Sequence, residues 1–136
     1  MNESNYPKQQ FGFVIIGADE HITSRIVTDL ESFAQRPWLI AAPTFVIDPE
    51  DPSILEVDLT VYSAHDVQLP KEIDQAHFEE VRFLIGWLQL LSAEYSLEIE
   101  CYLDQTFVGS ISAGLQDDLL SDGLLGEWER HLLVSK

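Results

Sequence analysis

The most regular hydrophobic pattern in the chain predicts a buried helix over residues 71–93. From Phe83 onward nearly every position is apolar, and a helix that is apolar all round is typical of the inside of a core. The run is shorter than the roughly 20 apolar residues that cross a bilayer. Gly86 in its middle predicts that another backbone or a bulky ring packs closely there. The inward positions at helical spacing are Phe78, Val81, Leu84, Ile85, Leu88 and Leu91.

Shorter patterns predict strands on both sides of this helix. Residues 54–64 and 97–103 alternate between apolar and polar, so each should bury one face and leave the other polar. The apolar run 11–18 is typical of a buried strand. Pro43 places the extended segment 38–47 at a sheet edge or breaks it there. A fifth strand over residues 106–112 follows 97–103 through a tight turn at Asp104-Gln105.

Two further helices complete the prediction. Asp19 is suited to cap a helix that runs to about residue 35, where Pro37 ends it. Asp117 and Asp118 open a last helix to about residue 134, which two glycines weaken in its first half. The expected inner face of this last helix is Leu119, Leu120, Leu124, Trp128 and Leu132.

The order of these elements predicts an α+β fold. The first six follow the βαββαβ order of ferredoxin-like units, and a further strand and helix come after them. We expect a single-layer sheet of about five strands with the helices packed on one face. Residues 1–10 are polar and predict a flexible lead-in, and residues 11–136 predict one domain.

Charge narrows the range of partners. The 136 residues include 24 Asp and Glu against seven Lys and Arg, a net charge of −17 spread over both halves of the chain. An acidic folded surface repels nucleic acid and anionic membranes and favours a basic protein partner. The single Cys101 excludes an intramolecular disulfide, and no apolar signal region follows Met1, so we expect a cytoplasmic protein.

Catalytic motifs are absent from the sequence. It contains no Walker loop, GxGxxG, HExxH or GxSxG pattern, and we expect neither an enzyme nor a bound cofactor. His65 beside Asp66 in a loop is a weak base candidate, and His77 with Glu80 has the spacing of two metal ligands. A core histidine is the simpler interpretation of His77, because it continues the apolar stripe of its helix.

Two other groups of residues have simple structural interpretations. Asp48, Glu50 and Asp51 could hold calcium, but they lack EF-hand spacing and read as a solvated turn. Cys101 alternates with Leu and Ile between acidic neighbours, which is typical of a small buried residue and not of a reactive thiol.

Polar faces of two predicted strands supply the candidate site. If both faces lie on the open side of the sheet, they place tyrosines inside an acidic rim, which suits a protein interface. The predicted partner-binding residues are Glu56, Asp58, Tyr62, Glu98, Glu100 and Tyr102.

The composition and the stretch FVGSISAGLQDDLLSDGLLGEWERHL (residues 107–132) resemble small acidic immunity proteins of bacterial toxin systems. That resemblance implies a non-enzymatic inhibitor that masks a cognate toxin. Such families differ in fold, so it assigns no individual binding residues.

A second resemblance concerns the first strand and helix. The stretch VIIGADEHITSRIV (residues 14–27) is similar to the opening of amino-acid-binding ACT domains, which share the βαββαβ order. It implies a small-ligand regulatory site at Gly17, Ala18, Asp19 and His21, although Glu20 and His21 stand where that family usually has glycine. A hydrolase or metal enzyme built on His65, Asp66 and His77, and a scaffold or subunit role, are the remaining alternatives.

Overall fold

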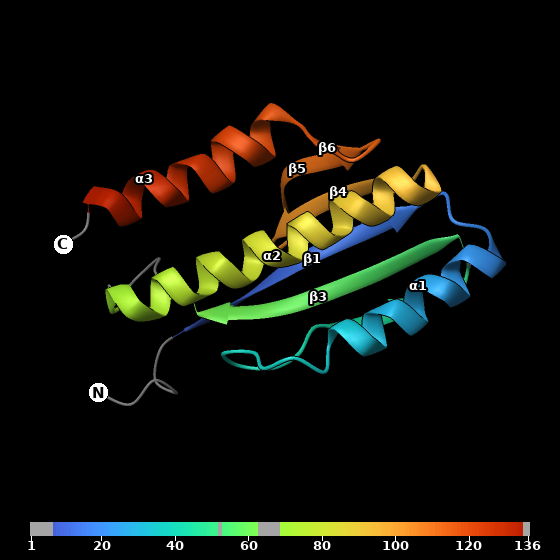
Figure 1. Ribbon diagram of the computed structural model, residues 1–136, viewed down its shortest axis with the longest axis horizontal. Helices are drawn as coiled ribbons and strands as arrows, with labels where there is room; N and C mark the ends of the chain where they lie inside the picture. Colours follow the sequence, from blue (N-terminus) through green and yellow to red (C-terminus); the bar gives the residue numbers. More distant parts are fainter. Residues whose placement is uncertain (1–6, 52, 63–68, 135–136) are drawn as a thin grey trace.

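The computed structural model describes residues 7–51, 53–62 and 69–134 (Figure 1). It is an α+β structure with one six-stranded sheet and three α-helices, as the hydrophobic pattern predicted, with one strand more than expected. The elements, in order, are β1 (Lys8–Ile16), α1 (Glu20–Phe33), β2 (Thr44–Ile47), β3 (Ile54–Tyr62), α2 (Lys71–Tyr95), β4 (Glu98–Leu103), β5 (Thr106–Ser112), β6 (Leu115–Gln116), the π-helix η2 (Leu119–Gly126) and α3 (Glu127–Val134).

The strands lie in the order β2-β3-β1-β4-β5-β6, and every neighbouring pair is antiparallel. β1 is therefore central, with Gly12 opposite Asp58 of β3 on one side and Tyr102 of β4 on the other. β2 lies at an edge, as Pro43 indicated, and its strand begins only after that proline.

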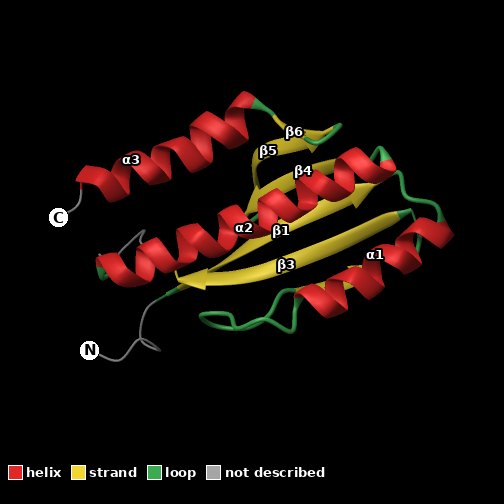
Figure 2. Cartoon of the chain, in the orientation of Figure 1, coloured by secondary structure: helices red, strands yellow, loops and turns green. Residues whose placement is uncertain are grey.

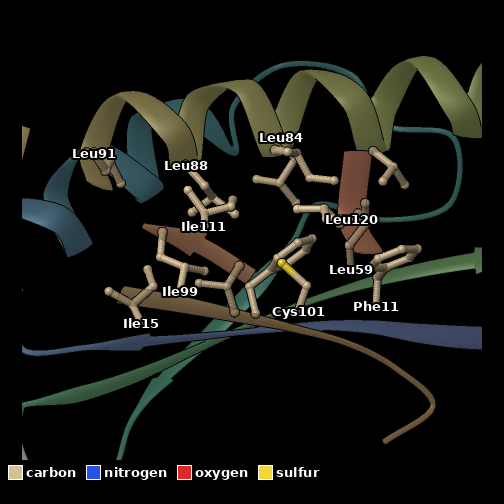
Figure 3. Close-up of a cluster of buried hydrophobic side chains, with 14 of the residues drawn as sticks. Phe11, Ile15, Leu59, Leu84, Leu88, Leu91, Ile99, Cys101, Ile111 and Leu120 are labelled. Carbon is tan, nitrogen blue, oxygen red and sulfur yellow. The ribbon is translucent and has the colours of Figure 1, made fainter. Parts of the chain in front are cut away.

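The buried faces of the strands and the apolar sides of the helices form one hydrophobic core between the sheet and the helices. Phe13 of β1, Val57 of β3 and Ile99 of β4 are fully buried and pack with the inward residues of α2 and η2. Figure 3 shows α2 lying above this layer of side chains, with Leu84, Leu88 and Leu91 directed at the sheet. The helices cover one side of the sheet (Figure 2), so the opposite side faces solvent.

Capping residues mark the start of α1 and the end of α2. The carboxylate of Asp19 accepts a hydrogen bond from the backbone N–H of Ile22 at 2.8 Å, which caps α1 as expected. α2 ends at Tyr95, within a few residues of the predicted boundary, and the next residue, Ser96, caps it in a left-handed conformation. The prediction for Gly86 was wrong: no atom lies within 4 Å of where its Cβ would be, so this glycine faces open space.

The C-terminal segment differs from the single α-helix that we expected. Its first half is the π-helix η2, whose wider turn brings residues five positions apart to the same side. Leu120 and Leu125 are buried for this reason, whereas Leu119, predicted to face inward, is 48% exposed. Leu120 also packs against Gly109, where a Cβ would lie 2.7 Å from the Leu120 backbone nitrogen.

Three boundaries shift for local reasons. β1 begins at Lys8 within the segment predicted as a lead-in, and Gly17 and Ala18 lie beyond its end. Residues 38–43 form no strand, and the Trp38 ring packs against Phe33 of α1. The additional strand β6 pairs with β5 just after Gly114 turns the chain. Within the described part of the chain, none of the helices is both long and apolar enough to span a membrane.

Candidate functional site: an acidic open face of the sheet

The side of the sheet opposite the helices, here called the open face, carries all the acidic residues of the described strands. Glu56 of β3 and Glu100 of β4 flank Val14 of β1 in one cross-strand row. Asp58 and Tyr102 flank Gly12 in the next row. Rows of this kind arise because every second residue of a strand points to the same face.

A broad concavity of about 710 Å³ lies over the two rows. Gly12 forms part of its floor, and a Cβ at this position would lie 3.3 Å from a carboxylate oxygen of Asp58. Glu56, Tyr102 and Asp104 line its sides. The concavity is open to solvent, so it suits a protruding side chain or loop better than an enclosed small molecule.

Some carboxylates of the open face accept hydrogen bonds from neighbouring residues, and others do not. Glu100 accepts a hydrogen bond from the Tyr102 hydroxyl at 2.9 Å, and Glu98 accepts one from Ser112 at 3.0 Å. Asp104 accepts one from the backbone N–H of Gln10 at 2.9 Å. The side chains of Glu56 and Asp58 belong to the second group, because neither has a hydrogen bond or ion pair to any described residue.

Ion pairs distinguish the two sides of the molecule. Those found among the described residues all lie in the helix layer, where Arg82 reaches Glu79 at 2.8 Å and Arg130 reaches Glu127 at 2.8 Å. In the described strands Lys8 is the single cation, and its ammonium lies 5.6 Å from the centre of the Tyr62 ring. The open face is therefore a patch of negative charge that the fold itself does not neutralise.

Ionisation on the open face reflects this environment. Partial burial of Asp58 in the concavity raises the pKa of its carboxyl group, because nearby protein atoms replace some of its water. The hydrogen bond to Glu100, followed by desolvation and the charge of Glu100, raises the pKa of Tyr102. Tyr102 also packs edge to face against Phe107 at 5.7 Å, so its ring is held in place on the face.

The structure brings together five of the six residues predicted for partner binding. Glu56, Asp58, Glu98, Glu100 and Tyr102 share the open face. Tyr62, at the end of β3, instead packs edge to face on His77 of α2 at 5.5 Å and against Leu69 and Ile73. The alternating pattern of β3 could not show this, because it does not reveal that the last residue of the strand packs against α2.

Asp104 is the acidic residue that the sequence did not assign to the site. It was interpreted only as part of the turn between β4 and β5, and it does adopt the left-handed conformation of such a turn. Its position directly after an alternating strand was the one feature of the sequence that could have assigned it to the site. The partner across the sheet, Gln10, lay in the segment predicted as a lead-in, so the contact was not expected.

His77 is a buried core residue, as the simpler interpretation predicted. It is 1% exposed, and its Nε2 accepts a hydrogen bond from the backbone N–H of Tyr62 at 3.1 Å. Its Nδ1 faces a carboxylate oxygen of Glu80 at 3.4 Å. His65 and Asp66 lie outside the described residues.

The residues predicted for an ACT-type site lie at the turn from β1 into α1 and at the start of that helix. The Asp19 carboxylate caps α1, and Ala18 is buried. His21 lies with Ser24 and Arg25 along a shallow, exposed depression on α1. Gly17 has the positive φ of 97° that favours glycine, at the turn from β1 into the helix.

The other chemical candidates have structural roles. Asp48 and Asp51 accept hydrogen bonds from the backbone N–H groups of Glu50 and Ser53 within their own turn. In the part of the chain that is described, no three acidic, histidine or cysteine side chains are grouped to hold a metal ion. Burial, with a smaller contribution from Asp117, raises the pKa of the Cys101 thiol to about 12.

Comparisons with protein-family models, with curated proteins and with solved structures found no match to this chain.

Proposed function

We propose that this chain is a non-enzymatic binding protein whose open face takes up a basic protein partner. The observation that carries the proposal is the contrast between the two sides of the molecule. Four carboxylates of the helix layer have arginine partners (Glu79, Asp122, Glu127 and Glu129), while Glu56 and Asp58 at the centre of the open face have none among the described residues. A basic partner would supply the missing counter-charges.

The geometry supports a two-step mechanism of binding. The field of the open face would first attract a positively charged partner and raise the rate of encounter at low salt. Close contact would then bury the aromatic pair Tyr102 and Phe107, the latter 44% exposed, beside the concavity. Aromatic residues inside a polar rim are the usual anchors of protein interfaces.

Affinity capture with matched variants tests this proposal. The double variant E56Q/D58N removes two charges from the open face. The control E31Q/E94Q removes two exposed charges from α1 and α2, whose side chains have no partner among the described residues. We expect the wild type and the control to retain the same basic protein from a lysate of the source organism at low salt, and E56Q/D58N to retain much less of it.

Two results would contradict the proposal. A protein retained equally by all three baits would bind elsewhere on the molecule. Equal loss with both double variants would show that only the total charge matters, and not the open face.

The finer proposal is that the partner is a bacterial toxin and the chain its cytoplasmic immunity protein. It is supported by the resemblance in composition and by the strong net charge of −17. The captured protein should be toxic when expressed alone and tolerated when the wild-type chain is co-expressed, with weaker protection by E56Q/D58N. A harmless partner would contradict this finer proposal and leave the binding function standing.

We also infer that the first six elements form a ferredoxin-like unit to which β5, β6 and the C-terminal helices are added. Support comes from the strand neighbours: β1 lies between β3 and β4, and β2 pairs with β3. In this arrangement the added elements extend the same sheet and so widen the open face.

A further inference from the structure

The outer edge of β2 is a row of backbone groups without a partner strand among the described residues. β2 pairs with β3 on one side only. The hydrogen bond from the Asp48 N–H to the Ile54 carbonyl, at 3.0 Å, shows which residues in this pairing direct their backbone groups toward β3. Because hydrogen-bonded and non-bonded pairs alternate in an antiparallel ladder, Phe45 and Ile47 direct their N–H and C=O groups outward.

β2 is a short edge strand of four residues, but its outer edge lacks other features that protect sheet edges. Natural edges are blunted by charged residues, bulges or prolines within the strand. The strand reads TFVI and contains none of them, since Pro43 precedes it. Val46 is 58% exposed on the open face and Ile47 is 46% exposed, so an added strand would also cover apolar side chains.

Charge around the edge indicates what kind of strand it would accept. The described residues of the β2–β3 hairpin, 44–51 and 53–62, contain five carboxylates and no Lys, Arg or His. Two of them, Glu56 and Asp58, pair in register with β2 itself, opposite Val46 and Thr44. A strand lying along this edge is therefore attracted if it is basic and repelled if it is acidic.

We propose that an extended basic segment of the protein partner adds to the outer edge of β2 as a seventh strand of the sheet. This inference rests on the proposed function and specifies how the partner is held. Backbone hydrogen bonds to Phe45 and Ile47 would fix the segment. Its alternate side chains would lie next to Val46 on the open face, where basic groups approach the carboxylates of β3.

An alternating Lys–Val heptapeptide is a suitable probe, because it is basic, extended and readily methylated at chosen backbone nitrogens. Methylation removes a backbone donor without changing any charge. In one derivative the amides of the lysines are methylated, and in the other those of the valines. Only one of the two sets can face β2 in a given register, since the amides of a strand point alternately to its two sides.

We expect one methylated peptide to bind at least about 10-fold more weakly than the other, as measured by calorimetry at low salt, and the better one to match the unmodified peptide. The amides of Phe45 and Ile47 should also exchange hydrogen more slowly when that peptide is bound, while the amide of Val46, already bonded to β3, should change little.

Equal affinity of the two methylated peptides would overturn strand addition. If that affinity is lost in E56Q/D58N but not in E31Q/E94Q, the open face still binds basic segments and the proposed function stands. Absence of binding by the unmodified peptide at low salt would also overturn strand addition, and the capture experiment would then decide the proposed function separately.

Discussion

Glu56 and Glu100 lie in the same row of the open face, one on each side of the central strand β1. Two strand spacings separate their backbones, about 10 Å. Like charges at about that distance repel by about 0.4 kcal/mol in water, and by more where protein displaces the water. The open face thus lowers the stability of the isolated fold, a cost that a basic partner would remove.

The first prediction follows from this repulsion. E56Q should raise the free energy of unfolding by about 0.4 kcal/mol at low salt, and the gain should shrink at 1 M salt because screening removes it. E31Q on α1 is the control and should give a smaller gain. Urea unfolding at two salt concentrations measures both. A loss of stability in E56Q would mean that Glu56 has a favourable contact on the face.

The second prediction concerns pH. Partial burial raises the pKa of Asp58 in the folded protein, so its ionised form costs more in the folded than in the unfolded state. The wild type therefore gains stability as the pH falls through this pKa, and D58N, which never ionises, does not. D58N should be the more stable protein at pH 7, and the difference should close toward about pH 3. A difference that is independent of pH would contradict this assignment.

The third prediction compares two glycines with opposite surroundings. G109A places a Cβ 2.8 Å from the Leu120 Cα on a backbone with φ of 144°, and should destabilise the fold by about 2–4 kcal/mol. G86A meets no atom within 4 Å in the middle of α2 and should stabilise it by about 0.5–1 kcal/mol. Thermal unfolding of the two variants should therefore shift in opposite directions. A tolerated G109A would show that η2 can move away from β5.

The fourth prediction is that Cys101 is unreactive in the folded protein. The thiol is fully buried, and its pKa of about 12 keeps it protonated near neutral pH, whereas the thiolate is the reacting form. Modification by iodoacetamide at about pH 8 should be slow and should follow the rate of unfolding, and it should be complete in denaturant. Rapid modification without denaturant would show that the strands around Cys101 open readily.

Much of the fold could be predicted because burial follows local periodicity. The alternation in β3 and β4 correctly separated the open face from the core, and the apolar stripe of α2 located its inward side. These patterns depend on each residue's own position in a helix or strand, so they can be read without tertiary contacts.

The remaining features depend on contacts that the sequence pattern does not contain. The π-helix η2 turned Leu119 outward and Leu125 inward, which an α-helical spacing could not predict. Tyr62 left the open face because His77 accepts its backbone N–H at the point where β3 ends. Asp104 joined the site through Gln10, a residue 94 positions away in sequence.

The measurement that tests the central claim most directly is the association rate of the captured partner with three proteins: the wild type, E56Q/D58N and E31Q/E94Q. Both double variants remove the same total charge, so only the place of the charge differs. We predict that at low salt E56Q/D58N associates several-fold more slowly than the control, and that the two rates converge at high salt. Equal rates for the two double variants at low salt would contradict the assignment of the open face as the binding surface.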